Sequence, residues 1–353
     1  MTLIAGCRTW SGVCIATDTR VTHKPISGKP FYKDNCQKSE IITGGPALAV
    51  AGDCQTATLF KKTLTKNYVN KFKELLKKRE IGIEVNEDPV ELLINLARES
   101  LIEVSNLKEV TSRPAKDTAI SGLIGLVDLV PMKLNKEECS NIIKALKYAP
   151  KSNRLFLDNA IEIFKCANGD IDCVEIKGFK QNALVSFENV LGSRTTKATL
   201  DVKEVPFGQV AVFGSGVSDD HIEEQYKTLA YLLLQTHADD IQLAAFHLTR
   251  THGWSEQVVG ENKKYGFKTF GGSTLAMMLM PDPNDPESRV ELAVLKGKFH
   301  RKPDGKIVSN IYKKDDGKLY VKGEDEKEYI LIPFSEYPIG GLESLELTLL
   351  KKP

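Results

Sequence analysis

The N-terminal segment of the chain constrains its fold more than any other part of the sequence. Two short apolar runs, at 3–10 and 13–16, flank a Ser-Gly turn signal, which is the pattern of two β-strands joined by a tight turn. In such a hairpin the first strand starts beside the point where the second strand ends. We therefore expect Thr2 to lie near Asp18, which follows the second run.

The next stretch repeats this arrangement and adds a basic residue. Apolar runs at 39–42 and 47–52 flank a Gly-Gly-Pro turn, and Lys38 stands at the start of the first of them. The sequence thus predicts that a hydroxyl at Thr2, a carboxylate at Asp18 and an ammonium at Lys38 meet at one end of one sheet.

The motifs MTLIAG, GVCIATDTRVT, KSEII and AVAGD of this segment resemble the start of a proteasome β-type subunit, a family of N-terminal-nucleophile hydrolases. The spacing from Thr2 to Asp18, Arg20 and Thr22 matches the family without a gap. Lys38 matches after extra residues are allowed in the loop 23–35. The similarity is dense over 1–60 and patchy over 205–282, where Gly-Ser-Gly at 214–216 and paired glycines at 271–272 stand.

The resemblance implies a role for each matched residue. Met1 would be removed, and Thr2 would become the nucleophile with its own α-amine as the base. Lys38 would lower the pKa values of both groups, Asp18 would hold Lys38, and Ser215 would support the amine. The residues expected to order the site and contact substrate are Arg20, Thr22, Gly52 and Gly216.

These residue types suit acyl-transfer chemistry. A threonine hydroxyl needs a base, and an N-terminal α-amine is one known solution. The reference pKa of an α-amine is about 7.7–8.0, so part of it is unprotonated near neutral pH. A nearby ammonium lowers that pKa further, and backbone N–H groups near Gly52 would stabilise the oxyanion of a tetrahedral intermediate.

The resemblance implies an α/β fold, the four-layer αββα sandwich, over residues 1–282. In that fold two stacked antiparallel sheets lie between layers of helices. Apolar periodicity predicts helices over 55–79 and 241–254, and the cap signal Asp88-Pro89 predicts another helix after it. A buried strand is expected over 118–130.

Two segments depart from this pattern. Residues 131–180 form a predicted insertion with helical patterns near 136–146 and 153–166. Residues 283–353 form a predicted β-rich C-terminal extension, which begins in a Pro-Asp cluster and carries Asp-Gly turns at 304–305 and 316–317.

Charge and cysteine usage exclude several functional classes. Lys and Arg number 48 against 47 Asp and Glu, which argues against a dedicated nucleic-acid or membrane-surface binder. No apolar run reaches the length of a membrane span. The seven cysteines form no CxxC pair, which favours free thiols over a metal site. We also expect His237, His247 and His252 to make polar contacts or lie at the surface rather than bind a ligand, and we expect a cytoplasmic protein without a cofactor.

The prediction is an N-terminal threonine hydrolase that cleaves peptide or amide bonds. The resemblance further implies a homo-oligomeric ring and a possible ATP-dependent unfoldase as partner. A small-amide hydrolase of the same fold and a non-catalytic, proteasome-like structural subunit are the alternatives.

One departure favours the non-catalytic alternative. The family has an aspartate shortly before the paired glycines and a serine next to them, but Phe267 and Phe270 occupy these places. No aspartate lies between 241 and 281. Glu256 or Glu261 would supply the carboxylate only if the loop is rearranged.

Overall fold

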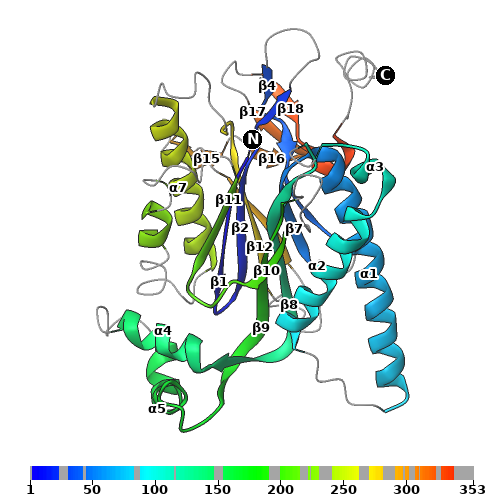
Figure 1. The fold of residues 1–353 in the computed structure, drawn as a ribbon. Coiled ribbons are helices and arrows are strands. Elements are labelled where there is room, and N and C mark those ends of the chain that lie inside the picture. The colour runs from blue at the N-terminus through cyan, green and yellow to red at the C-terminus, as the bar shows by residue number, and fades with distance from the viewer. Residues whose placement is uncertain are drawn as a thin grey trace.

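The structure is a computed structural model with helices and several antiparallel sheets (Figure 1), so the predicted α/β class is confirmed. It describes the following residues: 2–23, 31–42, 45–82, 88–114, 117–146, 154–190, 199–214, 222, 224–229, 241–261, 270–280, 291–296, 299–301, 307–309, 311–322 and 327–337.

The first five-stranded sheet contains the N-terminal hairpin and has the order β11-β1-β2-β12-β13. Its strands are β1 (Leu3–Thr9), β2 (Gly12–Asp18), β11 (Val210–Gly214), β12 (Thr274–Met280) and β13 (Glu291–Lys296). Ile4 pairs with Thr17, which confirms the predicted hairpin, but its turn residues are Trp10 and Ser11, since Gly12 belongs to β2. Thr274 pairs with Asp18 on the other side of β2. The central strands β1 and β2 are buried along their whole length.

The second five-stranded sheet has the order β10-β9-β8-β7-β6. Its strands are β6 (Ser39–Ile41), β7 (Ala47–Gly52), β8 (Ile120–Asn135), β9 (Cys173–Val190) and β10 (Thr199–Glu204). Strands β8 and β9 pair beyond Val127 after a register shift. The strand predicted over 118–130 therefore continues into the segment 131–180, and β9 begins inside that segment.

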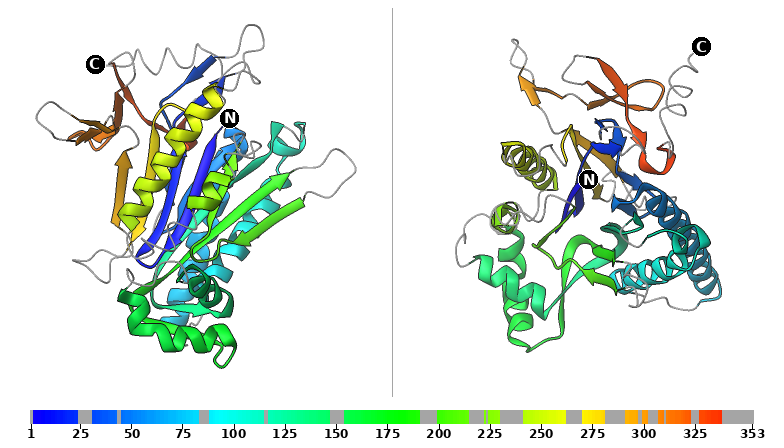
Figure 2. Two further views of the ribbon diagram at one scale, coloured as in Figure 1. Left: turned by 90° about the vertical axis from the view of Figure 1, so that its left-hand side faces the viewer. Right: turned by 45° about the horizontal axis from the view of Figure 1, so that its top comes forward.

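Apolar side chains pack between the two sheets and on the outer face of each sheet. One cluster joins Ile4 and Ile15 of the first sheet to Ala49, Leu123 and Leu184 of the second sheet. Because side chains alternate along a strand, the neighbours of Ile4 on β1 point the other way, toward α7 (Ile241–Glu261) (Figure 2, left). Helices α1 (Cys54–Glu80) and α2 (Pro89–Ser105) cover the outer face of the second sheet.

The start of α2 is the one that the sequence predicts. The Asp88 side chain accepts a hydrogen bond of 2.8 Å from the Val90 amide, and Pro89 occupies the first turn. This cap satisfies one of the free amides at the helix start. The short helix α3 (Lys108–Thr111) follows α2.

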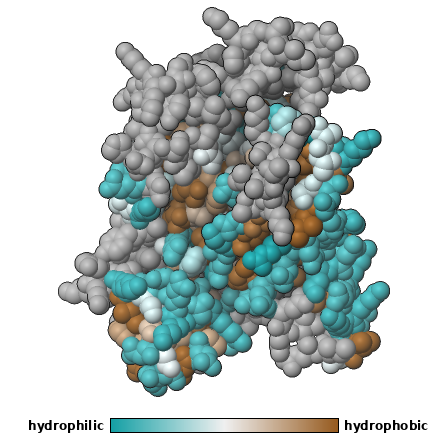
Figure 3. Space-filling view, in the orientation of Figure 1, coloured by the Kyte–Doolittle hydropathy of each residue, from teal (hydrophilic) through white to brown (hydrophobic). Residues whose placement is uncertain are grey.

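The insertion contains both predicted helices, α4 (Lys136–Leu146) and α5 (Arg154–Asn168). A capping box starts α4, since Asn135 and Glu138 each accept a 3.0 Å hydrogen bond from the other's amide. The two helices share an apolar cluster with Trp10. Apolar surface is visible on this part of the molecule (Figure 3), where α5 exposes Ile161.

The C-terminal extension begins by completing the core. Its first described strand, β13, pairs with β12 at the edge of the first sheet, so the predicted boundary at 283 falls between two strands of one sheet. The remaining elements are β14 (Phe299–Arg301), β15 (Ile307–Ser309), β16 (Ile311–Lys313), β17 (Leu319–Lys322), β18 (Glu328–Ile330), β19 (Ile332–Pro333) and the 3-10 helix η3 (Phe334–Glu336). The sheet β16-β17-β18 packs on Leu275 of β12.

The extension lies at the same end of the molecule as the N-terminus (Figures 1 and 2). Also at this end are the short strands β3 (Val21–His23), β4 (Phe31–Lys33) and β5 (Cys36–Gln37). Across the described ranges, no helix combines the length and apolar character needed to cross a membrane.

Candidate active site

Asp18 is the centre of the candidate site. It ends β2 and is 2 % exposed. Its Oδ1 atom accepts hydrogen bonds from Lys38 Nζ and from the Leu3 amide, both at 2.8 Å. Its Oδ2 atom accepts from the amides of Arg20 and Gly271, both at 3.2 Å. One buried carboxylate thus joins segments that are far apart in the sequence.

Lys38 is brought to the start of β1 by this carboxylate. The lysine lies between β5 and β6, is 4 % exposed, and its carbonyl accepts a 3.2 Å hydrogen bond from Val50. Because Lys38 Nζ and the Leu3 amide bind the same oxygen, the ammonium lies within two hydrogen-bond lengths of the peptide that follows Thr2. A buried ion pair of this kind is costly to break, since it leaves an uncompensated charge.

Gly214 of β11 also packs against the backbone of Thr2. Leu3 pairs with Gly214, which has a φ of +116°. A Cβ atom at Gly214 would lie 1.7 Å from the Thr2 carbonyl oxygen, so a side chain at this position is excluded. Thr2 itself is 7 % exposed. The two predicted residues that follow Gly214, Ser215 and Gly216, lie outside the described residues, as does Met1.

His252 supports the same peptide from α7. Its Nε2 atom lies 3.2 Å from the Leu3 carbonyl oxygen, and its Nδ1 atom lies 2.5 Å from the Tyr226 hydroxyl. Burial lowers the pKa of His252 to about 4, so the ring is neutral near pH 7. The network assigns the proton to Nε2, which donates to Leu3, and Nδ1 then accepts from Tyr226. The prediction that His252 makes polar contacts is confirmed, His247 is partly buried, and His237 lies outside the described residues.

Arg20 is held by an acidic partner. Its Nε and Nη2 atoms donate to the two carboxylate oxygens of Asp34 at 2.7 and 2.8 Å, and Nη1 donates to the Phe270 carbonyl at 3.4 Å. Paired hydrogen bonds of this kind fix the planar guanidinium group. Arg20 therefore orders the segment after Asp18. The backbone of Thr22 pairs with Tyr32, and the Thr22 side chain is outside the description.

Gly52 offers accessible backbone at the end of a buried strand. It is the only exposed residue of β7. Its φ is +110°, and a Cβ atom would lie 2.2 Å from the Ala119 carbonyl oxygen, so glycine is required here. The next residue, Asp53, caps α1 through Thr56 and forms two 2.8 Å hydrogen bonds with Arg113.

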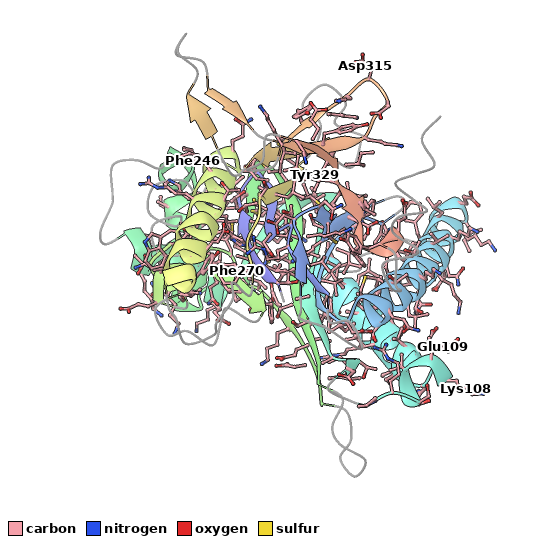
Figure 4. The ribbon with its side chains drawn as sticks, turned by 90° about the horizontal axis from the view of Figure 1, so that it is seen from above. Lys108, Glu109, Phe246, Phe270, Asp315 and Tyr329 are labelled. Atoms are coloured by element: carbon pink, nitrogen blue, oxygen red, sulfur yellow. The ribbon has the colours of Figure 1, made fainter. Side chains whose placement is uncertain are left out.

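Glu256 places a carboxylate beside the paired glycines. Its Oε1 atom accepts a long hydrogen bond of 3.4 Å from the Gly272 amide. A Cβ atom at Gly271 would lie 2.4 Å from this oxygen and 2.9 Å from Arg20 Nη1, so the carboxylate and the guanidinium are close neighbours. Seen from above, Phe270 lies between α7 and the first sheet (Figure 4).

Helical spacing is the sequence signal that identifies Glu256. It lies four residues after His252, on the same face of α7. Of the two glutamates that the sequence offers in place of the missing aspartate, Glu256 contacts the glycines, and it does so from the helix.

The buried cysteines are poor candidates for a nucleophile, and Cys173 is the one exposed thiol among the described residues. All seven are unpaired thiols in the described residues, and burial raises the pKa of Cys7 to about 12 and that of Cys54 to about 11. The reactive form of cysteine is the thiolate, which these surroundings disfavour. Within the described part of the chain, no three His, Cys, Asp or Glu side chains are grouped to hold a metal ion.

Comparison with known proteins adds no identification. No family model matches the chain, and no curated protein matches it either. A functional assignment therefore rests on the geometry around Asp18 and on the resemblance of the N-terminal motifs.

Proposed function

We propose that this chain is an N-terminal threonine hydrolase that cleaves peptide or amide bonds, built on the four-layer αββα sandwich of the N-terminal-nucleophile hydrolases. The observation that carries this proposal is the hydrogen-bonded unit in which one Asp18 oxygen binds both Lys38 Nζ and the amide that follows Thr2. The stacking of two antiparallel sheets, with helices against the outer face of each, supports the proposed fold.

In the proposed mechanism, removal of Met1 gives Thr2 a free α-amine. The amine takes the proton of the Thr2 hydroxyl as Oγ1 forms a bond to the substrate carbonyl carbon. The C–N bond then breaks, the leaving amine takes the proton, and an ester on Thr2 remains. Water attacks this ester with the α-amine again as base, which releases the acid and restores Thr2.

The surrounding groups have electrostatic roles. The Lys38 ammonium keeps the α-amine unprotonated and stabilises negative charge near Oγ1, and the hydrogen bond from Lys38 to Asp18 orients the ammonium. Backbone N–H groups near the exposed Gly52 would receive the oxyanion. The peptide or amide substrate, a cytoplasmic location, a homo-oligomeric ring and an ATP-dependent unfoldase partner follow from the resemblance alone.

A non-catalytic structural subunit is the second candidate. The burial of Thr2, which is 7 % exposed, favours it, because a nucleophile must be reached by its substrate. In that case the Asp18–Lys38 pair would only tie the start of β1 to the second sheet.

The intact mass of the protein, expressed without an N-terminal tag, separates the two candidates. A peptide epoxyketone closes a ring on a threonine hydroxyl and its own free amine, so it reports both groups at once. We expect Met1 to be absent and one adduct to form, and we expect Thr2→Ala to abolish the adduct. A retained Met1 without any adduct would rule out the hydrolase and leave the structural subunit.

A further inference from the structure

We propose that the C-terminal extension is a working part of the candidate active site. Residues 332–337, which we call the strap, position residues 34–38, which we call the Lys38 segment. This inference rests on the role proposed for Lys38 above. It assigns the strap a positioning function rather than contact with substrate.

The strap extends the backbone pairing of the Lys38 segment. Strand β19 runs parallel to β5, with Ile332 opposite Cys36, and the Ile332 amide donates to the Asn35 carbonyl at 2.8 Å. On its other side, the Cys36 amide donates to the Thr19 carbonyl at 3.1 Å. The Lys38 segment is therefore held between the strap and the residue that follows Asp18.

Two aromatic side chains of the strap are anchored in the core. Phe334 and Tyr337 are each 4 % exposed and belong to the apolar cluster that contains Cys36 and the inner face of α1. The Tyr337 hydroxyl donates to Asn35 Oδ1 at 2.9 Å. Burial raises the pKa of Tyr337, so this hydroxyl keeps its proton. The strap thus binds the Lys38 segment through the Tyr337 side chain as well as through the Ile332 backbone.

Ser335 holds the chain on the far side of Lys38. Its amide donates to Glu40 Oε1 at 3.0 Å, and its hydroxyl donates to Glu40 Oε2 at 3.0 Å. Lys61 of α1 pairs with Glu40 and donates to the Ser335 hydroxyl at 2.9 Å. Glu40 is 8 % exposed and lies two residues after Lys38. Contacts with Asn35 and Glu40 therefore bracket the lysine.

These polar contacts distinguish a positioning strap from a simple cover. A strap that only covered the apolar cluster would need the rings of Phe334 and Tyr337 but no hydrogen bond to Asn35 or Glu40. The hydrogen bonds of Ser335 and of the Tyr337 hydroxyl instead restrict the chain on both sides of Lys38. Loss of these hydrogen bonds would let the Lys38 segment shift, and the Lys38 ammonium would then move relative to Asp18 and Thr2.

The test uses the full chain with the double substitution Ser335→Ala and Tyr337→Phe, which removes these side-chain bonds and keeps the aromatic ring. Tyr320→Phe is the matched control, because its hydroxyl donates to Asp316 at 2.8 Å within the same extension. Two quantities are measured: the rate of epoxyketone addition to Thr2, and hydrogen exchange of peptides that span 34–40.

We expect the double variant to slow the addition about fivefold or more, as the loss of a few modest hydrogen bonds allows, and to speed exchange over 34–40. The control should change neither quantity. Unchanged exchange over 34–40, or faster exchange with an unchanged addition rate, would overturn the proposal. If the unmodified chain forms no adduct, the proposed hydrolase function fails, and exchange alone then decides whether the strap holds the segment.

Discussion

Two buried groups of charges lie at opposite ends of the hairpin β1–β2. Near the turn, Arg8 is 2 % exposed and pairs with Glu138 at 3.1 Å and Glu204 at 2.6 Å. At the other end, Asp18 is equally buried and pairs with Lys38 at 2.8 Å. Burial and pairing do not tell the two ends apart, so neither property is sufficient to identify a catalytic site.

The partners of each charge do tell them apart. Arg8 contacts the side chains of Glu138, Glu204 and Asn182 and, at 3.5 Å, the Val205 carbonyl. These contacts tie the insertion and the second sheet to β1, away from Thr2. Asp18 instead binds three backbone amides besides Lys38, and one of them belongs to the residue after Thr2. A carboxylate that fixes the backbone beside the Thr2 hydroxyl is what the proposed hydrolase needs, whereas the contacts of Arg8 only join elements of the fold.

The largest difference between the two ends should appear in reactivity. We expect Lys38→Met to slow epoxyketone addition to Thr2 by about a thousandfold, because the ammonium that keeps the α-amine unprotonated is lost. Arg8→Met is the matched control, and its folded fraction should react within about twofold of the unmodified rate. If Lys38→Met and Arg8→Met slow epoxyketone addition equally, the two ends of the hairpin do not differ in function.

The Arg8 group should contribute strongly to stability. Arg8→Met leaves Glu138 and Glu204 without their buried cation, and we expect the free energy of unfolding in urea to fall by about 3–5 kcal/mol. Burial raises the pKa of Glu204 even with Arg8 beside it, so its carboxylate depends on this cation. Lys203→Met breaks an exposed ion pair with Asp201 and should cause no measurable change. A loss no larger than that of Lys203→Met would show that the Arg8 group is not a structural tie.

The site end has an acid-sensitive support in a buried histidine. Buried His252 has a pKa of about 4, whereas an unfolded chain has its ordinary value of about 6.5. Between these values the unfolded state binds more protons, so stability falls as the pH drops from about 6.5 to about 4. The expected loss is on the order of 3 kcal/mol.

Thermal or urea unfolding at pH 7 and pH 4 measures this loss, with His252→Gln as the comparison. Glutamine can still donate to Leu3 and accept from Tyr226, but it does not titrate. The variant should therefore lose less stability on acidification than the unmodified chain. Equal losses in the two proteins would mean that His252 is not the acid-sensitive support.

The parts of the fold that the sequence predicts correctly are those with local signals. The N-terminal hairpin, whose turn falls one residue earlier than predicted, and the Asp88 cap are each encoded within a few residues. The hairpin geometry alone brings Asp18 to the start of β1. The strap escapes prediction because its contacts join residues 295 apart, as between Ser335 and Glu40, and no local pattern marks them. The sequence names Glu256 and Glu261 as alternatives for the carboxylate beside the paired glycines, and only the structure shows that Glu256 contacts them from α7.

Glu256 gives the smallest expected effect in this comparison of the two ends and marks how far the site extends beyond Asp18. We expect Glu256→Gln to slow epoxyketone addition about tenfold, because the negative charge beside Arg20 is lost while an acceptor for the Gly272 amide remains. Glu256→Ala should slow it further, since that acceptor is lost as well. Glu99→Gln on the exposed side of α2 is the control for a change of net charge. If both Glu256 variants react at the unmodified rate, the site ends at the Asp18–Lys38 pair, and the contact between Glu256 and the glycines only supports the loop.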